Sequence, residues 1–203
     1  MPYGFRLLAC LLAAGTRVQL VYSTAAQIVA KQECDVTLPA QPREAARMLV
    51  ERLGAKRGEL VVYARDDWLA PMASGSNPGD GMVICPCTMG TLGAIAAGSA
   101  DNLIERAADV MLKERKPLIL VPRETPFSTI HLDNMLRLAN AGAIILPPSP
   151  GFYLKPTSVD DLVDFVVARI LDRLGIEHEL TRRWGDEKGS GSILRGGVER
   201  ARP

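Results

Sequence analysis

The sequence predicts an α/β fold, a three-layer doubly wound parallel sheet of the Rossmann-like or flavodoxin-like kind. Short apolar runs alternate along the chain with longer segments of helical periodicity, the order typical of a parallel sheet covered by helices. The run Leu118–Val121 has no polar residue, as expected of a strand buried on both faces. The 203 residues are enough for one domain with its own core, which we assign to residues 1–187.

The first half of the chain begins with a predicted helix at 4–14 and a strand at 16–22. Ser23 and Thr24 come next and offer the hydroxyl N-cap of a second helix. A hydroxyl cap where a strand ends is also an anion site, and the sequence leaves plain capping and anion binding as equal alternatives. A third helix at 43–53 and a strand at 59–64 follow.

A long loop at 66–80 leads to the buried strand 82–85, a sharp turn at Pro86 and a helix that opens near Thr88. A strand, a turn of small residues and a helix N-terminus suit a phosphate or a flat ring pressed against the backbone. Cys85 and Cys87 have the spacing of two metal ligands, but without a second pair they do not predict a zinc site.

The segment 101–115 is predicted to be a helix whose apolar face includes Met111. Arg106 and Lys113 are two turns apart and share another face. Asp109 is spaced to pair with both cations, so the ordinary interpretation of this face is a solvated, ion-paired stripe.

The stretch Met111–Pro126 carries the strongest functional signal among the residues themselves. Its strand ends at Pro122 and is followed at once by Arg123 and Glu124. Ligands of open α/β sheets bind outside the carboxyl ends of the strands, so this pair is placed where a ligand lies. Arginine offers a planar fork to phosphate or carboxylate, and a carboxylate beside it can accept or give a proton.

The last part of the sheet region comprises a helix at 128–141, a strand at 143–146 and a proline-rich loop at 147–156. A long helix at 158–174 follows, with Val159 among its inward residues and Arg169 as an ordinary surface cation. Residues 188–203 are rich in Gly, Ser and Arg and are predicted to be a disordered tail.

Composition excludes several classes of function. A net charge of +1 gives no sign of nucleic-acid binding, and no apolar run reaches the ~18 residues of a membrane span. Four cysteines in a chain of this length indicate thiols in a cytoplasmic protein rather than a disulfide framework. With only two histidines, a histidine-based metal site is not expected, and we predict no metal.

Several long motifs resemble, in order, those of UbiX-type flavin prenyltransferases. They are V-I-C-P-C-T-M-G-T-L, R-A-A-D-V-M-L-K-E-R-K-P-L-I-L-V-P-R-E-T-P, L-P-P-S-P-G-F-Y and L-V-D-F-V-V-A-R-I-L-D. The resemblance covers residues 3–185. It implies a cytoplasmic homododecamer that joins the dimethylallyl group of dimethylallyl monophosphate to reduced FMN without a metal. The product, prenylated FMN, serves partner UbiD-type decarboxylases in ubiquinone biosynthesis or aromatic acid metabolism.

The resemblance also assigns roles to residues by their motif positions. FMN-binding positions of the family correspond to Ser23, Thr88, Met89, Gly90, Thr91 and Arg123. Positions around the substrate phosphate correspond to Arg106, Lys113, Tyr153 and Arg169, and Trp184 matches an aromatic near the site. Catalytic roles fall to Glu33, Glu124 and Lys113. Some of these residues are expected to come from neighbouring subunits.

One family feature is not matched. The family begins with a strand that ends in G-A-S-G at the flavin, whereas this chain opens with M-P-Y-G. One hypothesis is a start assigned too far downstream. An in-frame strand ending in G-A-S-G in the upstream genomic sequence would support it, and a stop codon just before Met1 would exclude it. Without that strand we expect poor stability and weak FMN binding, which tight stoichiometric binding would refute.

Three alternatives stay open. An FMN-binding or storage protein would share the fold and the flavin contacts, but it would have no use for Arg106, Lys113, Tyr153 and Arg169. A cysteine-decarboxylating flavoprotein typically has a histidine base after the first helix region, where this sequence has none. A truncated, inactive homologue is the third.

Overall fold

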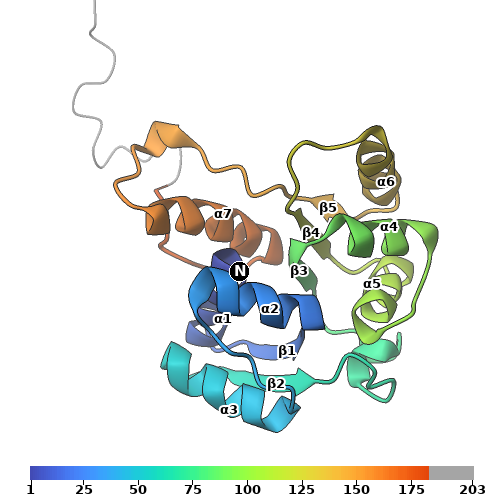
Figure 1. The fold of residues 1–203 in the computed structure, drawn as a ribbon, viewed down its shortest axis with the longest axis horizontal. Coiled ribbons are helices and arrows are strands. Elements are labelled where there is room, and N and C mark those ends of the chain that lie inside the picture. Colours follow the sequence, from blue (N-terminus) through green and yellow to red (C-terminus); the bar gives the residue numbers. More distant parts are fainter. Residues whose placement is uncertain (183–203) are drawn as a thin grey trace, which may run out of the picture.

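The computed structural model describes residues 1–182, and Figure 1 shows their arrangement. Helices and strands alternate for most of the chain, as predicted. The elements are α1 (Pro2–Ala13), β1 (Arg17–Val21), α2 (Thr24–Cys34), α3 (Pro42–Leu53), β2 (Glu59–Tyr63), η1 (Pro71–Ala73), β3 (Met82–Cys87), α4 (Met89–Ala97), α5 (Leu103–Lys113), β4 (Leu118–Pro122), α6 (Thr129–Asn140), β5 (Ile144–Ile145), η2 (Phe152–Leu154) and α7 (Val159–Leu174).

The strands of the described residues pair in parallel and form two sheets. One sheet has the order β1-β2 and the other the order β3-β4-β5. Within residues 1–182, the second edge of β1 and the second edge of β3 have no strand partner. The continuous sheet that the sequence predicts is therefore divided between β1 and β3, and Figure 1 shows the two groups of strands apart.

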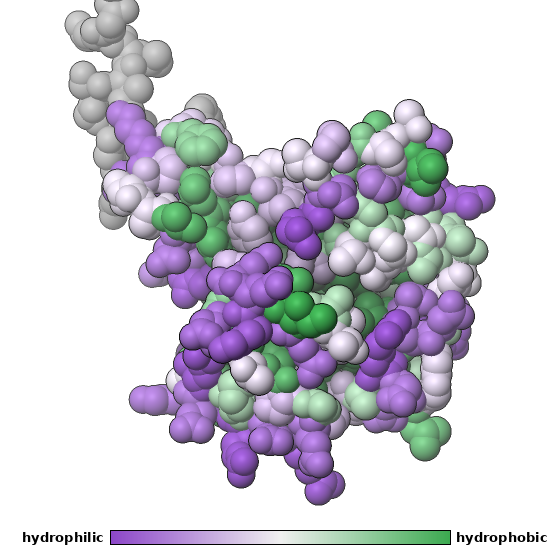
Figure 2. Space-filling view, in the orientation of Figure 1, coloured by the Kyte–Doolittle hydropathy of each residue, from purple (hydrophilic) through white to green (hydrophobic). Residues whose placement is uncertain are grey.

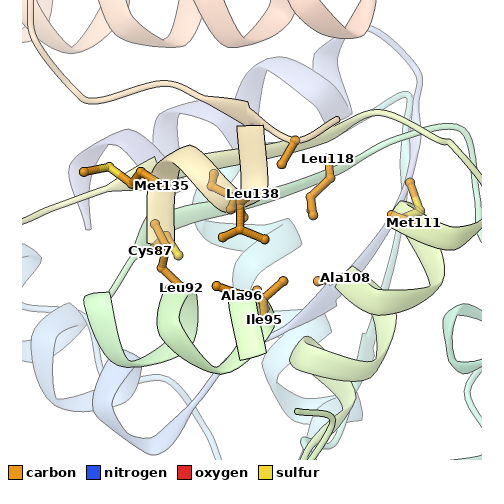
Figure 3. Packing of buried hydrophobic residues seen from close by; sticks show 11 residues of the cluster. Cys87, Leu92, Ile95, Ala96, Ala108, Met111, Leu118, Met135 and Leu138 are labelled. Carbon is orange, nitrogen blue, oxygen red and sulfur yellow. The ribbon is translucent and has the colours of Figure 1, made fainter. Parts of the chain in front are cut away.

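The central strand β4 explains the layers of the larger sheet. Its side chains alternate between two faces because successive residues of a strand point in opposite directions. Leu118 and Leu120 join a core with α4, α5 and α6, and Figure 3 shows that cluster. Ile119 and Val121 join a second core with α1 and α7. Helices cover both faces of β4, which confirms the predicted three-layer α/β arrangement.

A third cluster holds the smaller sheet in place. It contains Leu12 of α1, Ala30 of α2 and Leu49 of α3, with Val18 and Leu20 of β1 packed against it. The helix α1 therefore contributes to two cores, since Leu7 of the same helix belongs to the α7 cluster.

Two local predictions are wrong. The strand β3 does not turn at Pro86 but continues to Cys87, which pairs with Pro122 of β4 after a register shift between Ile84 and Cys87. Val159 does not point inward: 73% of it is exposed, since it is the first helical residue after the N-cap Ser158. The predicted domain end at 187 and the tail 188–203 lie outside the described residues.

Candidate functional site

The first part of the candidate site is the turn where β3 ends and α4 begins. Thr88 is the N-cap of α4, and its Oγ1 accepts a hydrogen bond from the Thr91 N–H at 3.2 Å. The same hydroxyl donates to Thr91 Oγ1 at 3.1 Å. Met89 packs on the core beneath, and a Cβ on Gly90 would meet nothing closer than 3.9 Å. The turn therefore presents two hydroxyls and a helix N-terminus, an arrangement that favours an anion.

The Arg-Glu pair lies beside this turn. The backbone N–H of Arg123 donates to the Cys87 carbonyl at 3.1 Å, which joins the ends of β4 and β3. The Arg123 side chain is exposed, and it forms no ion pair with another described residue. Glu124 is also exposed, and its Oε1 accepts from the Thr125 N–H at 3.2 Å. The Arg123 cation, the Glu124 carboxylate and the hydroxyls of Thr88 and Thr91 thus lie together at the carboxyl ends of β3 and β4.

A cavity of about 280 Å³ opens where β5 ends. Its lining combines two arginines and a serine with apolar residues. The lining residues are Ile144, Ile145, Leu146, Pro147, Ser149, Phe165, Val166, Arg169 and Arg173. Such a lining suits a small ligand with an anionic head and a hydrocarbon body.

Tyr153 lies next to this cavity. Its ring packs edge-on against Phe165, with ring centres 5.9 Å apart and planes at 82°. A Cβ on Gly151 would lie 2.5 Å from Cε1 of Tyr153, so the ring rests directly on the glycine backbone. Tyr153 therefore contacts Phe165, which lines the same cavity as Arg169.

The other two predicted phosphate ligands lie on α5, against the loop around η1. Arg106 donates from Nε to the Ala73 carbonyl at 3.0 Å and from Nη1 to Asp109 Oδ2 at 3.0 Å. Lys113 pairs with Glu114, so its predicted pairing with Asp109 is wrong.

The cause is the close approach of the loop to the end of α5. A Cβ on Gly75 would lie 2.6 Å from Lys113 Nζ and 2.1 Å from Glu114 Oε1. The loop also carries the hydroxyls of Ser74 and Ser76, whose Oγ atoms are 2.9 Å apart. Arg106, Lys113 and these two serines form a second polar group, which we call the α5 group.

The α5 group and the cavity belong to different layers of the chain. Helix α5 packs on the side of β4 that holds Leu118 and Leu120, whereas α7, which carries Arg169, packs on the side of Ile119 and Val121. Figure 1 shows the two helices on either side of the three-stranded sheet. A single chain therefore does not bring the four predicted phosphate ligands together.

Helix α2 carries two further predicted residues at its two ends. Ser23 is the N-cap, and its Oγ accepts from the Ala26 N–H at 3.1 Å. Glu33 lies about 15 Å along the helix, at a rise of 1.5 Å per residue, and binds the N-terminal ammonium of Met1 at 2.5 Å. Ser23 follows β1 of the smaller sheet, and Thr88 follows β3 of the larger one. Trp184 lies outside the described residues.

Sequence reasoning missed part of the cavity. Ser149, Phe165 and Arg173 line it but were not singled out. The spacing of Arg173, four residues after Arg169, was a usable signal, since residues at i and i+4 share a helix face. No such periodicity exists in the loop that holds Ser149.

The thiols of Cys85 and Cys87, at the end of β3, have a structural role rather than a catalytic one. Burial raises the pKa of Cys85 to about 12 and the pKa of Cys87 to about 12. Neither is a thiolate near neutral pH, so neither is a ready nucleophile. Within residues 1–182, no three His, Cys, Asp or Glu side chains are grouped to hold a metal ion.

Comparison with known proteins decides the family. The family model described as Flavoprotein matches residues 1–171. The flavin prenyltransferase UbiX of Pseudomonas aeruginosa is 57% identical over 185 residues, which cover 91% of this chain and 88% of that protein. This chain belongs to the UbiX flavin prenyltransferase family.

Solved UbiX structures agree with the fold. AnUbiX, crystallised in complex with FMN and dimethylallyl pyrophosphate, has a TM-score of 0.79 and 42% identity, over 90% of this chain and 89% of that chain. A dodecameric FMN-dependent UbiX-like decarboxylase from Escherichia coli O157:H7 has a TM-score of 0.79 and 43% identity, over 90% of this chain and 92% of that chain. The resemblance seen in the motifs and the α/β fold are confirmed, while the roles of individual residues stay predictions.

Proposed function

We propose that this protein is a flavin prenyltransferase, which transfers the dimethylallyl group of dimethylallyl monophosphate to reduced FMN and releases phosphate. Family membership supports the reaction, and the cavity at the end of β5 carries the assignment of the substrate. Arg169 and Arg173 would face the phosphate, while Phe165 and the apolar walls would hold the five-carbon chain.

The residues at the ends of β3 and β4 fit FMN. The N-terminus of α4 with Thr88 and Thr91 suits the FMN phosphate or a ring edge. Arg123, which has no competing ion pair among the described residues, is available to the flavin. Bound reduced FMN would supply the electron-rich acceptor. Glu124, exposed next to Arg123, would accept the proton released as the flavin is alkylated.

The cations have a defined task in this reaction. A monophosphate carries nearly two negative charges near pH 7 and gains charge as it leaves. In a metal-independent reaction, protein cations must offset that charge. We assign this role to Arg169, Arg106 and Lys113, with the Tyr153 hydroxyl. Removing one such preorganised donor typically costs about 10²–10³ in rate.

The arrangement of these cations supports a shared site between subunits. Arg106 and Lys113 lie on the other side of β4 from Arg169, so we propose that the α5 group of one subunit completes the cavity of a neighbour in a homododecamer. Exposed apolar side chains also gather near the cavity, and Figure 2 shows them over η2 and the start of α7. They include Phe152, 72% exposed, and Val159, 73% exposed, which gives a second subunit apolar area to bury.

Mass spectrometry of the flavin tests the reaction directly. The protein is incubated anaerobically with reduced FMN and dimethylallyl monophosphate, and in parallel with the diphosphate. We expect the flavin mass to rise by one dimethylallyl unit with the monophosphate. Product from the diphosphate alone would correct the substrate. Unmodified FMN bound tightly in both reactions would instead support a storage protein.

Mixed oligomers test the shared site. Lys113→Ala and Arg169→Ala variants are each expected to be nearly inactive. Coexpressed in equal amounts, the two variants should recover about one quarter of wild-type activity. Random assembly gives that share of the sites both an intact α5 group from one subunit and an intact cavity from its neighbour. A coexpressed pair of Lys113→Ala and Arg106→Ala is the control, since both changes fall in the α5 group and no intact group forms. Equal recovery in the two mixtures would contradict a shared site.

Two wider assignments belong to the same proposal. Prenylated FMN serves as a cofactor of other enzymes, so we expect a UbiD-type decarboxylase as the functional partner. We also expect a cytoplasmic enzyme, which the free thiols of the four cysteines support. No helix within residues 1–182 is both long and apolar enough to cross a membrane.

A further inference from the structure

Arg169 is held by a short chain of polar contacts at the end of α7. Its Nη1 donates to Asp172 Oδ2 at 2.9 Å. The other oxygen of the same carboxylate, Oδ1, lies 3.2 Å from Nε2 of His178. Asp172 thus joins a cavity arginine to a histidine that lies outside the cavity lining.

The backbone brings His178 back to the helix it has left. Gly175 ends α7 with φ of 69°, a left-handed conformation that glycine adopts without strain. The chain then reverses, and Ile176 and Leu180 pack against the core between α1 and α7. These two anchors place the histidine ring beside Asp172, and only 10% of its side chain is exposed.

Both ring nitrogens of His178 are occupied. The Leu180 N–H donates to Nδ1 at 3.3 Å, so Nδ1 must offer its lone pair. The ring proton therefore lies on Nε2 and is donated to Asp172. A ring fixed at both nitrogens is a rigid support for the carboxylate, which has no other polar partner among the described residues than His178 and Arg169.

The support leaves Arg169 free to act on a ligand. A guanidinium has five N–H donors, and Asp172 uses one from Nη1. The remaining donors are available at the cavity that Arg169 lines with Arg173. An arginine already held in place loses less side-chain freedom when an anion binds, an effect worth about 3- to 10-fold in affinity for one long side chain.

We propose that Asp172 and His178 are positioning residues that hold the Arg169 guanidinium toward the phosphate of the prenyl donor. The inference rests on the proposed function, because it requires a phosphate at Arg169. It adds two residues that need not touch the substrate and act through the arginine.

The test compares KM and kcat for dimethylallyl monophosphate, together with binding of inorganic phosphate to the FMN-loaded oligomer by calorimetry. In His178→Ala we expect KM and the phosphate dissociation constant to rise about 3- to 10-fold, with kcat changed much less. His178→Gln keeps an N–H donor near the position of Nε2 and should recover most of the loss. Asp172→Ala should match or exceed His178→Ala.

Asp164→Ala is the matched control on the same helix. Asp164 accepts two hydrogen bonds from Arg6, at 2.6 Å and 3.0 Å, and does not line the cavity. It should lower the melting temperature without changing KM. If it raises KM as much as His178→Ala does, the effect is loss of helix stability and the inference is wrong.

A double variant separates this inference from the proposed function. In Arg169→Ala, a further His178→Ala change should not raise the phosphate dissociation constant any further, because the arginine through which the histidine acts is absent. Additive losses would overturn the positioning role and leave the phosphate site intact. If Arg169→Ala itself leaves KM and phosphate binding unchanged, the phosphate does not lie at Arg169, and both the placement and the inference fail.

Discussion

Thr88→Ala separates the capping role of this hydroxyl from a binding role. The hydroxyl accepts from the Thr91 N–H at 3.2 Å and starts α4. Losing such a cap costs about 1 kcal/mol of unfolding free energy, or about 2–4 °C in melting temperature for a chain of this size. If the hydroxyl or the ordered helix start also binds the FMN phosphate, the loss of a charged hydrogen bond costs about 1.5–3 kcal/mol in binding. That corresponds to a dissociation constant about 10- to 150-fold higher.

The matched control is Ser158→Ala on α7. Ser158 is also an N-cap, and its Oγ accepts from the Asp161 N–H at 3.1 Å. It should cost similar stability without weakening FMN. Thr88→Ser keeps the oxygen and should behave as wild type in both assays. Thermal unfolding and fluorescence titration with FMN measure the two effects. Thr88→Ala with a lowered melting temperature and wild-type FMN affinity would refute the binding role and leave plain capping.

Three further predictions concern the α5 group, the stability of the protein at acid pH and the buried thiol of Cys87. In Gly75→Ala the new Cβ would lie 2.6 Å from Lys113 Nζ. Because the lysine tip can move, we expect a melting temperature within about 2 °C of wild type and a raised KM for dimethylallyl monophosphate. An unchanged KM would contradict the role of Lys113. Hydrogen bonds from the Thr157 backbone, and then its side chain, lower the pKa of Asp161. The stabilisation is therefore present above the unfolded pKa of ~3.9 and is lost as the pH falls through the folded pKa. In Asp161→Asn the melting temperature should vary less with pH in that range. An unaltered pH profile would contradict this role of Asp161. Burial raises the pKa of Cys87 to about 12, so iodoacetamide should label this thiol only when the protein unfolds. Peptide mass spectrometry measures the labelling. Fast labelling of the native protein would mean that the end of β3 opens.

The sequence predicted best what depends on neighbouring residues. Ser23 and Thr88 are N-caps because a hydroxyl directly before a helical pattern can accept a backbone N–H within one turn. The position of Arg123 and Glu124 at a strand end follows from an apolar run that stops at a proline. These signals are local, so tertiary structure did not change them.

What the sequence missed depends on distant contacts. The continuation of β3 through Pro86 depends on a partner strand, since Cys87 pairs with Pro122 of β4. The partner of Lys113 changed because the loop at Gly75 approaches the end of α5. Arg173 joined the cavity because β5 ends beneath α7. Only Arg173 leaves a periodic trace, its spacing of four residues from Arg169; the other contacts join segments that are far apart in the chain and leave none.

The same limit applies to the phosphate ligands, where the layers of the fold decide the outcome. The motifs put Arg106, Lys113 and Arg169 in one clamp, but packing puts α5 and α7 on opposite sides of β4. Layers packed at about 10 Å from each other leave the two helices about 20 Å apart, too far for one phosphate to contact side chains of both through the sheet. Either the clamp is built from two subunits, or only one of the two groups binds the phosphate. Recovery of activity by Lys113→Ala mixed with Arg169→Ala distinguishes these outcomes, because a site built within one chain retains a defect in every subunit.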